Sequence, residues 1–186
     1  MDLFEFILII TSVVYALALA QILAGIGRLA QSETTIKYYF PHTAWVAILF
    51  IGILLTWWAG WEFRGIEWTF AKYVYLFISP ILFFLMTSLL IPQNLSESGV
   101  DLEQHFNRVR RPTFISYFVL MVIQFADGPL LASEPWWFSG RLPQLAFLAV
   151  VAVSAFTTNR RLQTLCPIGV IVFLIYAVVV RFWIPV

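Results

Sequence analysis

The stretch LFEFILIITSVVYALALAQILAGIGRL, residues 3–29, decides the fold class of this chain. No charged residue occurs in it between Glu5 and Arg28. A helix needs about 20 apolar residues to cross the hydrocarbon core of a bilayer, which is about 30 Å thick. The stretch therefore predicts a membrane-spanning helix. The preceding start is acidic and has no basic region of the kind found in a signal peptide, so we expect this helix to be retained.

The composition of the whole chain points the same way. Of its 186 residues, 61% are hydrophobic and only 11% are charged, whereas soluble domains carry about 25% charged residues. So few charges could not cover a surface that faces water. The sequence predicts an integral membrane protein, with residues 1–186 forming a single transmembrane domain.

Five further apolar runs follow the first. They are continuous rather than alternating, which favours helices over the strands of a membrane barrel. We therefore predict an all-α fold, an integral membrane bundle of six transmembrane helices. The expected spans are residues 3–29, 39–61, 70–91, 113–131, 142–158 and 162–184.

The distribution of basic residues predicts the orientation, because cytoplasmic loops are enriched in lysine and arginine. The loops after the first, third and fifth spans hold most of them and are expected in the cytoplasm, with both termini outside. The general plan is similar to that of many small bacterial membrane proteins, so the expected location is a bacterial inner (plasma) membrane. The two groups are Arg28, Lys37, Arg108, Arg110, Arg111, Arg160 and Arg161 on the inner side, and Arg64, Lys72, Arg141 and Arg181 on the outer side.

The loop before the fourth span has a helical pattern of its own. Leu102, Phe106 and Val109 recur at i, i+4 and i+7, which predicts a short amphipathic helix lying on the cytoplasmic membrane surface. Arginines on such a helix bind anionic lipid headgroups. The expected headgroup-binding residues are Arg108, Arg110 and Arg111.

Two local patterns concern helix packing. Ala16, Ala20 and Ala24 recur at spacing four in the first span, and small residues let helix backbones approach closely. The stripe predicts packing inside the bundle or, alternatively, a homo-oligomer seam. Asp127-Gly128-Pro129 should end or break the fourth span, because proline removes a helical hydrogen bond.

The stretch TWWAGWEFRGIEW, residues 56–68, concentrates tryptophans and acids at the predicted outer face. Tryptophan settles at the membrane–water boundary, and ionisable residues at membrane depth are functional candidates by default. We predict an outward-facing aromatic and acidic vestibule that binds or transports a small solute, with a cation as the expected class. Its candidate residues are Glu5, Trp57, Trp61, Glu62, Gln124, Asp127 and Arg181.

The sequence is also compatible with other functions. Asp127 could simply pair with Arg181, and the tryptophans could be an anchoring belt. The protein could be an accessory subunit of a larger membrane complex, or a membrane redox or lipid enzyme that uses His42 and His105. The sequence has no catalytic motif such as HExxH, GxSxG or CxxC, and we predict neither a cofactor nor a nucleic-acid partner.

Overall fold

The computed structural model describes residues 3–93, 99–137 and 141–182. In these ranges the fold is helical, as predicted, with two-residue strands in two of the loops. The helices are α1 (Leu3–Ala30), α2 (Phe40–Ala59), α3 (Phe70–Leu90), α4 (Leu102–Leu131), α5 (Leu142–Phe156) and α6 (Arg160–Phe182), with a short 3-10 helix, η1, at Gly60–Phe63.

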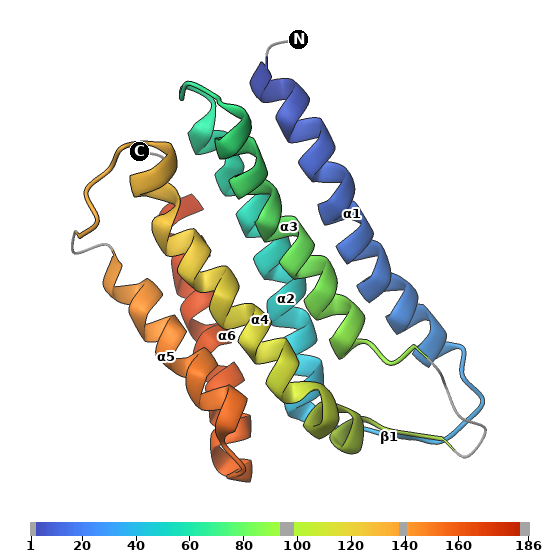
Figure 1. The fold of residues 1–186 in the computed structure, drawn as a ribbon. Helices are drawn as coiled ribbons and strands as arrows, with labels where there is room; N and C mark the ends of the chain where they lie inside the picture. The colour runs from blue at the N-terminus through green and yellow to red at the C-terminus, as the bar shows by residue number, and fades with distance from the viewer. Residues whose placement is uncertain (1–2, 94–98, 138–140, 183–186) are drawn as a thin grey trace.

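The helices form two layers, and successive helices run in opposite directions (Figure 1). The front layer places α1, α3, α4 and α5 side by side, while α2 and α6 pack together behind it. The start of α1 and the α2–α3 and α4–α5 connections lie at one end, called here the tryptophan end. It holds Trp57, Trp58, Trp61, Trp68, Trp136 and Trp137. The opposite, arginine end holds Arg108, Arg110, Arg111, Arg160 and Arg161.

Four of the described helices are long and apolar enough to cross a membrane: α1, α2 with η1, α3 and α4. The fifth helix is apolar but has only 15 residues. At 1.5 Å per residue it spans about 22 Å, which is shorter than the hydrocarbon core. The structure thus supports four spans by length and composition, and the six-span bundle remains a prediction.

The structure contradicts the separate amphipathic helix, because residues 102–111 form the first turns of α4. The Asp101 carboxylate caps α4 by accepting a hydrogen bond from the Gln104 amide, at 2.9 Å. Leu102 and Phe106 are buried. The apolar face of this segment therefore packs on the other helices instead of on the membrane surface.

The fourth helix ends near Asp127-Gly128-Pro129, as expected, because α4 stops at Leu131, but it is not broken before that residue. Pro129 lies in the last turns of the helix, where its missing N–H leaves a single carbonyl, that of Phe125, without its usual partner. That carbonyl is taken up by a side chain from the following loop, as described below.

The core between the layers is aromatic at its centre. Trp45 of α2 is 2% exposed, and its ring meets the ring of Phe114 on α4 edge-on, with the centroids 4.7 Å apart. Such pairs stabilise a core beyond their buried area. Trp45 is thus a core residue, unlike the tryptophans at the tryptophan end.

Helix α1 packs through a different face from the one expected. Tyr15, Ala18, Ile22 and Gly25 are buried. A Cβ atom on Gly25 would lie 2.2 Å from Cγ2 of Ile91, so only glycine allows this approach of α1 to the end of α3. The predicted stripe packs nowhere inside the bundle, because its three alanines are exposed: Ala16, Ala20 and Ala24.

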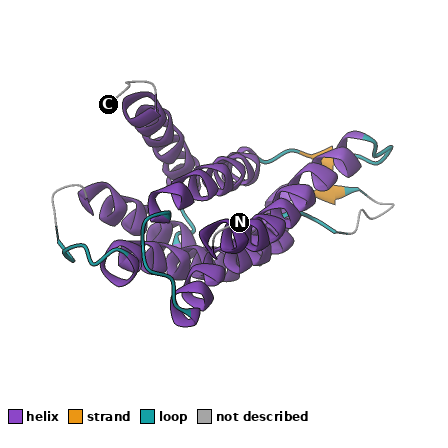
Figure 2. Cartoon of the chain, turned by 90° about the horizontal axis from the view of Figure 1, so that it is seen from above, coloured by secondary structure: helices purple, strands orange, loops and turns teal. Residues whose placement is uncertain are grey.

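Two loops at the arginine end are tied together by a strand pair that the sequence did not suggest. Strand β1 (Ile36–Lys37) pairs in parallel with β2 (Val100–Asp101), and Figure 2 shows the pair (orange) at one side of the bundle. Gly99 enters β2 with a φ of 100°, which favours glycine. The Lys37 ammonium lies 2.8 Å from the Asp101 carboxylate and lowers the pKa of that carboxyl.

Candidate functional site

The polar groups at the tryptophan end gather around the last turns of α4. Gln124 and Asp127 are three residues apart and therefore share one face of the helix. The Gln124 amide donates a hydrogen bond to the Thr56 hydroxyl of α2, at 3.1 Å. Asp127 is half-buried, and the Tyr75 hydroxyl of α3 lies close to its carboxylate.

The Tyr75 hydroxyl is shared between two acceptors. It donates to the carbonyl oxygen of Ile123, at 2.6 Å, and also lies within hydrogen-bonding range of the Asp127 carboxylate. A hydroxyl has one proton, so it serves one acceptor at a time. The ion pairs among the described residues join Lys37 or Arg160 to acids at the arginine end. The Asp127 carboxylate is thus held in the protein without a basic partner among them.

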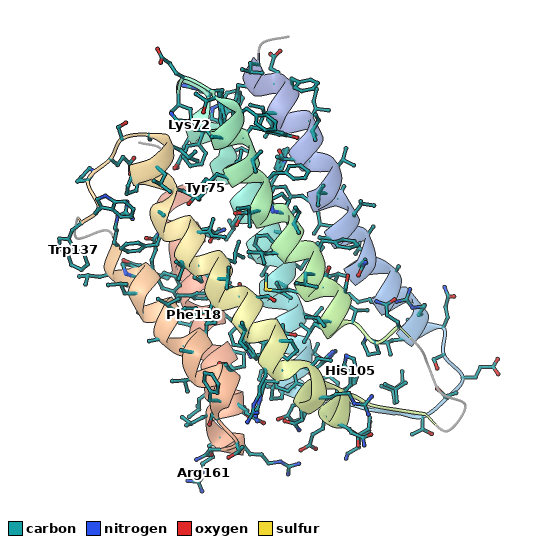
Figure 3. All side chains as sticks on the ribbon, viewed as in Figure 1. Lys72, Tyr75, His105, Phe118, Trp137 and Arg161 are labelled. Atoms are coloured by element: carbon teal, nitrogen blue, oxygen red, sulfur yellow. The ribbon has the colours of Figure 1, made fainter. Side chains whose placement is uncertain are left out.

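Helix α3 is fixed against α4 at this end. Thr69 caps α3 by accepting a hydrogen bond from the Lys72 amide, at 3.3 Å. The Lys72 ammonium donates to the carbonyl of Leu131, the last residue of α4, at 3.0 Å, where a cation is favoured by the helix dipole. Figure 3 shows Lys72 and Tyr75 near this end, where α3 runs beside α4.

A buried arginine that the sequence did not single out completes this end. Arg141 is 2% exposed and donates to the Phe125 carbonyl, while its guanidinium lies over the Phe125 ring, 4.6 Å from the centroid. Pro129 is the reason that this carbonyl is available. The Glu134 carboxylate and the Arg141 guanidinium both approach Gly128, within 2.3 and 3.1 Å of the position of a Cβ atom. In the sequence, the pattern that could have indicated this contact is Pro129, a proline four residues after Phe125.

The aromatic part of the predicted vestibule lies on the surface of α1, α2 and η1. Trp57 is 41% exposed and donates to the Ser12 hydroxyl, at 2.8 Å. Trp61 is 57% exposed, and the Arg64 guanidinium covers its ring, 5.0 Å from the centroid. Together with Leu8 and Trp58 these indoles line an apolar groove of about 320 Å³.

The structure therefore divides the vestibule residues into two groups. Gln124 and Asp127 lie together between the helices, whereas Trp57, Trp61, Glu5 and Glu62 are exposed at the same end. Arg181 falls in α6, but the position of its side chain lies outside the described part of the structure, so its pairing with Asp127 remains a prediction.

The two histidines, which the sequence placed on separate segments, meet at the arginine end. Nε2 of His42 and Nε2 of His105 lie 2.9 and 3.0 Å from the carbonyl oxygen of Leu90. Leu90 is the last residue of α3, and the last carbonyls of a helix lack partners within it. The two imidazoles thus cap α3. The sequence could not predict this meeting of the two histidines, because it depends on a tertiary contact: the extended start of α4 brings His105 to the end of α3.

The three arginines predicted to bind headgroups differ in their surroundings. Arg110 is 6% exposed and donates to the Thr157 carbonyl at the end of α5, so its guanidinium lies inside the protein. Arg108 and Arg111 are exposed. Only Arg108 of the three lines the pocket of the arginine end that is described below.

Within the described residues, no group of three or more His, Cys, Asp or Glu side chains could hold a metal ion. Comparison with protein families, with curated proteins and with solved structures finds no match to this chain. The functional argument therefore depends on the geometry of the two ends of the bundle.

Proposed function

We propose that this membrane protein binds a small cation through Asp127 and passes it between the membrane surface and the helix bundle. The observation that supports the proposal is the half-buried Asp127 carboxylate, whose described partner is a shared tyrosine hydroxyl. An ionised carboxylate away from water is costly unless a charge or several hydrogen bonds compensate it. A bound cation would supply that compensation.

Neighbouring groups suit a cation. Because the Gln124 amide nitrogen is engaged by Thr56, its carbonyl oxygen remains an acceptor on the same helix face as Asp127. Oxygen atoms from carboxylates, amides and hydroxyls are the ligands that small hard cations prefer. The exposed acids Glu5 and Glu62 at the same end would raise the local concentration of cations.

The proposed orientation places the tryptophan end, and with it both termini, outside the cell, in a bacterial inner membrane. It is supported by the arginines of the arginine end, among them Arg161 (Figure 3), since arginine-rich loops stay in the cytoplasm. Accessibility labelling tests it: cysteines replacing Trp61 and Arg161, in a Cys166→Ser background, should react from opposite sides of the membrane.

The test of function compares Asp127→Asn with Glu67→Gln in proteoliposomes. Glu67 is an exposed acid in the η1–α3 connection, so its change alters the same charge without touching the helix interior. Na⁺, K⁺ and proton fluxes are measured for each variant with ion-selective dyes. We expect Asp127→Asn to lower the flux of at least one of these ions about tenfold and Glu67→Gln to leave it within twofold. Equal fluxes in all three proteins would refute the proposal.

A second candidate function is that of an interaction subunit, and the exposed stripe on α1 favours it. Ala16, Ala20 and Ala24 lie on the outside of the bundle, where a helix from a second copy or from another protein could approach closely. Native mass spectrometry in mild detergent tests this candidate. An assembly that persists in the wild type and is lost in Ala20→Leu would support it, and an unchanged monomer would contradict it.

A further inference from the structure

A pocket of about 310 Å³ opens at the arginine end, where the chain passes from α3 into α4. Its polar lining comes from Ser88, Gln93, His105 and Arg108, and Ile91 and Val109 provide apolar walls. Small-molecule sites typically have volumes of about 300–1,000 Å³ and combine apolar walls with a few polar groups. The size and lining of this pocket therefore suit a small ligand or a headgroup.

The described lining of the pocket carries one charged side chain, the arginine Arg108. Among the described residues that line it, none is an aspartate or a glutamate. Two described acids at the start of α4 are already engaged, Asp101 of β2 with Lys37 and Glu103 of α4 with Arg160. Arg108 is exposed, and no described residue forms a hydrogen bond or an ion pair with its guanidinium. The pocket therefore favours an anion over a cation or a neutral molecule.

The other polar groups complement this arginine. The Gln93 amide makes one long contact, 3.4 Å to the Ile91 carbonyl, and so has a second N–H available. When His105 donates Nε2–H to the Leu90 carbonyl, its Nδ1 carries a lone pair that can accept a hydrogen bond. Donors and one acceptor beside a guanidinium match a phosphate ester, which has anionic oxygens and, in many headgroups, a neighbouring hydroxyl.

The last turn of α1 brings a second arginine, Arg28, to the arginine end of the bundle. Helix α1 runs along the α3 side of the pocket, because Gln21 accepts a hydrogen bond from Ser88, at 3.0 Å, and Gly25 contacts Ile91. Arg28 follows on the same face of α1, three residues after Gly25. Its Nε atom is buried and has no hydrogen-bond partner among the described residues. This adds to the positive potential around the pocket.

We propose that this pocket binds a phosphate-bearing anion, with Arg108 as the principal ligand and Gln93 and His105 as hydrogen-bond partners. Arginine suits this role because its planar fork of N–H donors matches phosphate oxygens in a bidentate contact. The anion can come from two sources, a phospholipid headgroup or a soluble phosphate ester. The site lies at the opposite end of the bundle from Asp127, so its test does not depend on the outcome of the test of the proposed cation function.

The test compares Arg108→Gln with Arg111→Gln in the full-length protein. Both arginines are exposed on α4, three residues apart, but only Arg108 lines the pocket. The first probe is lipid: native mass spectrometry measures retention of phosphatidylglycerol and of phosphatidylcholine. The second probe is glycerol 3-phosphate, titrated into delipidated protein in a non-ionic detergent. Melting temperatures of both variants establish that the fold persists.

We expect Arg108→Gln to weaken binding of one probe about tenfold, the size expected for one lost hydrogen bond to a charged group. Arg111→Gln should change the affinity for that probe less than twofold. Arg108→Lys keeps the charge but loses the planar fork of N–H donors, so its affinity should lie between those of the other two variants. Dependence on Arg108 with phosphatidylglycerol alone identifies a lipid site, and the same dependence with glycerol 3-phosphate identifies a soluble ligand. Equal effects of Arg108→Gln and Arg111→Gln on both probes would overturn the proposal.

Discussion

The contact between Arg141 and α4 gives the sharpest test of how this bundle is held together. Arg141→Met should destabilise the protein, because it removes the donor to the partly buried Phe125 carbonyl and the cation above the Phe125 ring. An unsatisfied buried carbonyl costs about 1–3 kcal/mol, and a desolvated cation–π contact contributes about 2 kcal/mol. Allowing for overlap between these effects, we expect the free energy of unfolding to fall by about 2–4 kcal/mol.

The role of Pro129 can be isolated by a double-mutant cycle. Pro129→Ala restores the N–H that donates to the Phe125 carbonyl in a regular helix, so the carbonyl no longer depends on Arg141. In this background we expect Arg141→Met to cost only about 1–2 kcal/mol, mainly from the lost ring contact and packing. Chemical unfolding in detergent micelles, followed by tryptophan fluorescence, measures all four proteins. An equal cost of Arg141→Met in both backgrounds would refute the reasoning.

Two further predictions concern the packing of α1 and the strand pair at the arginine end. Gly25→Ala should lower the free energy of unfolding by about 1–3 kcal/mol, because its Cβ would overlap the Ile91 side chain. Gly27→Ala, where nothing lies within 4 Å of the added atom, should be neutral or stabilising, and the same chemical unfolding assay compares the two. The Asp101 carboxyl has a pKa lowered by Lys37, so its contribution is present above its unfolded value of about 3.9 and is lost as the pH falls through the lower folded value. Hydrogen exchange of the Val100 amide should therefore accelerate at low pH more in the wild type than in Asp101→Asn, after correction for intrinsic rates.

The sequence by itself determined where most of the helices lie, the start of α4 being the exception. The predicted bounds for the first three spans agree with α1, α2 with η1, and α3 to within two residues. The reason is physical: a backbone placed in lipid must satisfy its hydrogen bonds internally, so a long apolar run has few options besides a helix. The order of apolar runs and loops also predicted that the tryptophans and the arginines lie at opposite ends. The reason is that successive antiparallel helices place alternate loops at the same end.

Only the tertiary structure decided which faces of those helices meet. The sequence of α1 has two faces that could pack on other helices, and the alanine stripe was the one predicted to do so. The face with Gly25 packs instead, because Ile91 fits against it. Likewise Leu102 and Phe106 have the pattern of a surface helix, and the neighbouring helices bury them instead.

The candidate functional residues show the same difference between what the sequence predicts and what the tertiary structure decides. Ionisable Asp127 could be selected from the sequence because a carboxylate in an apolar run is rare, but its partner Tyr75 comes from another helix. The meeting of His42 and His105 at Leu90, and the pocket beside it, depend on the extended start of α4. Local periodicity encodes helices, whereas contacts between residues far apart in the chain depend on side-chain shapes that no short pattern records.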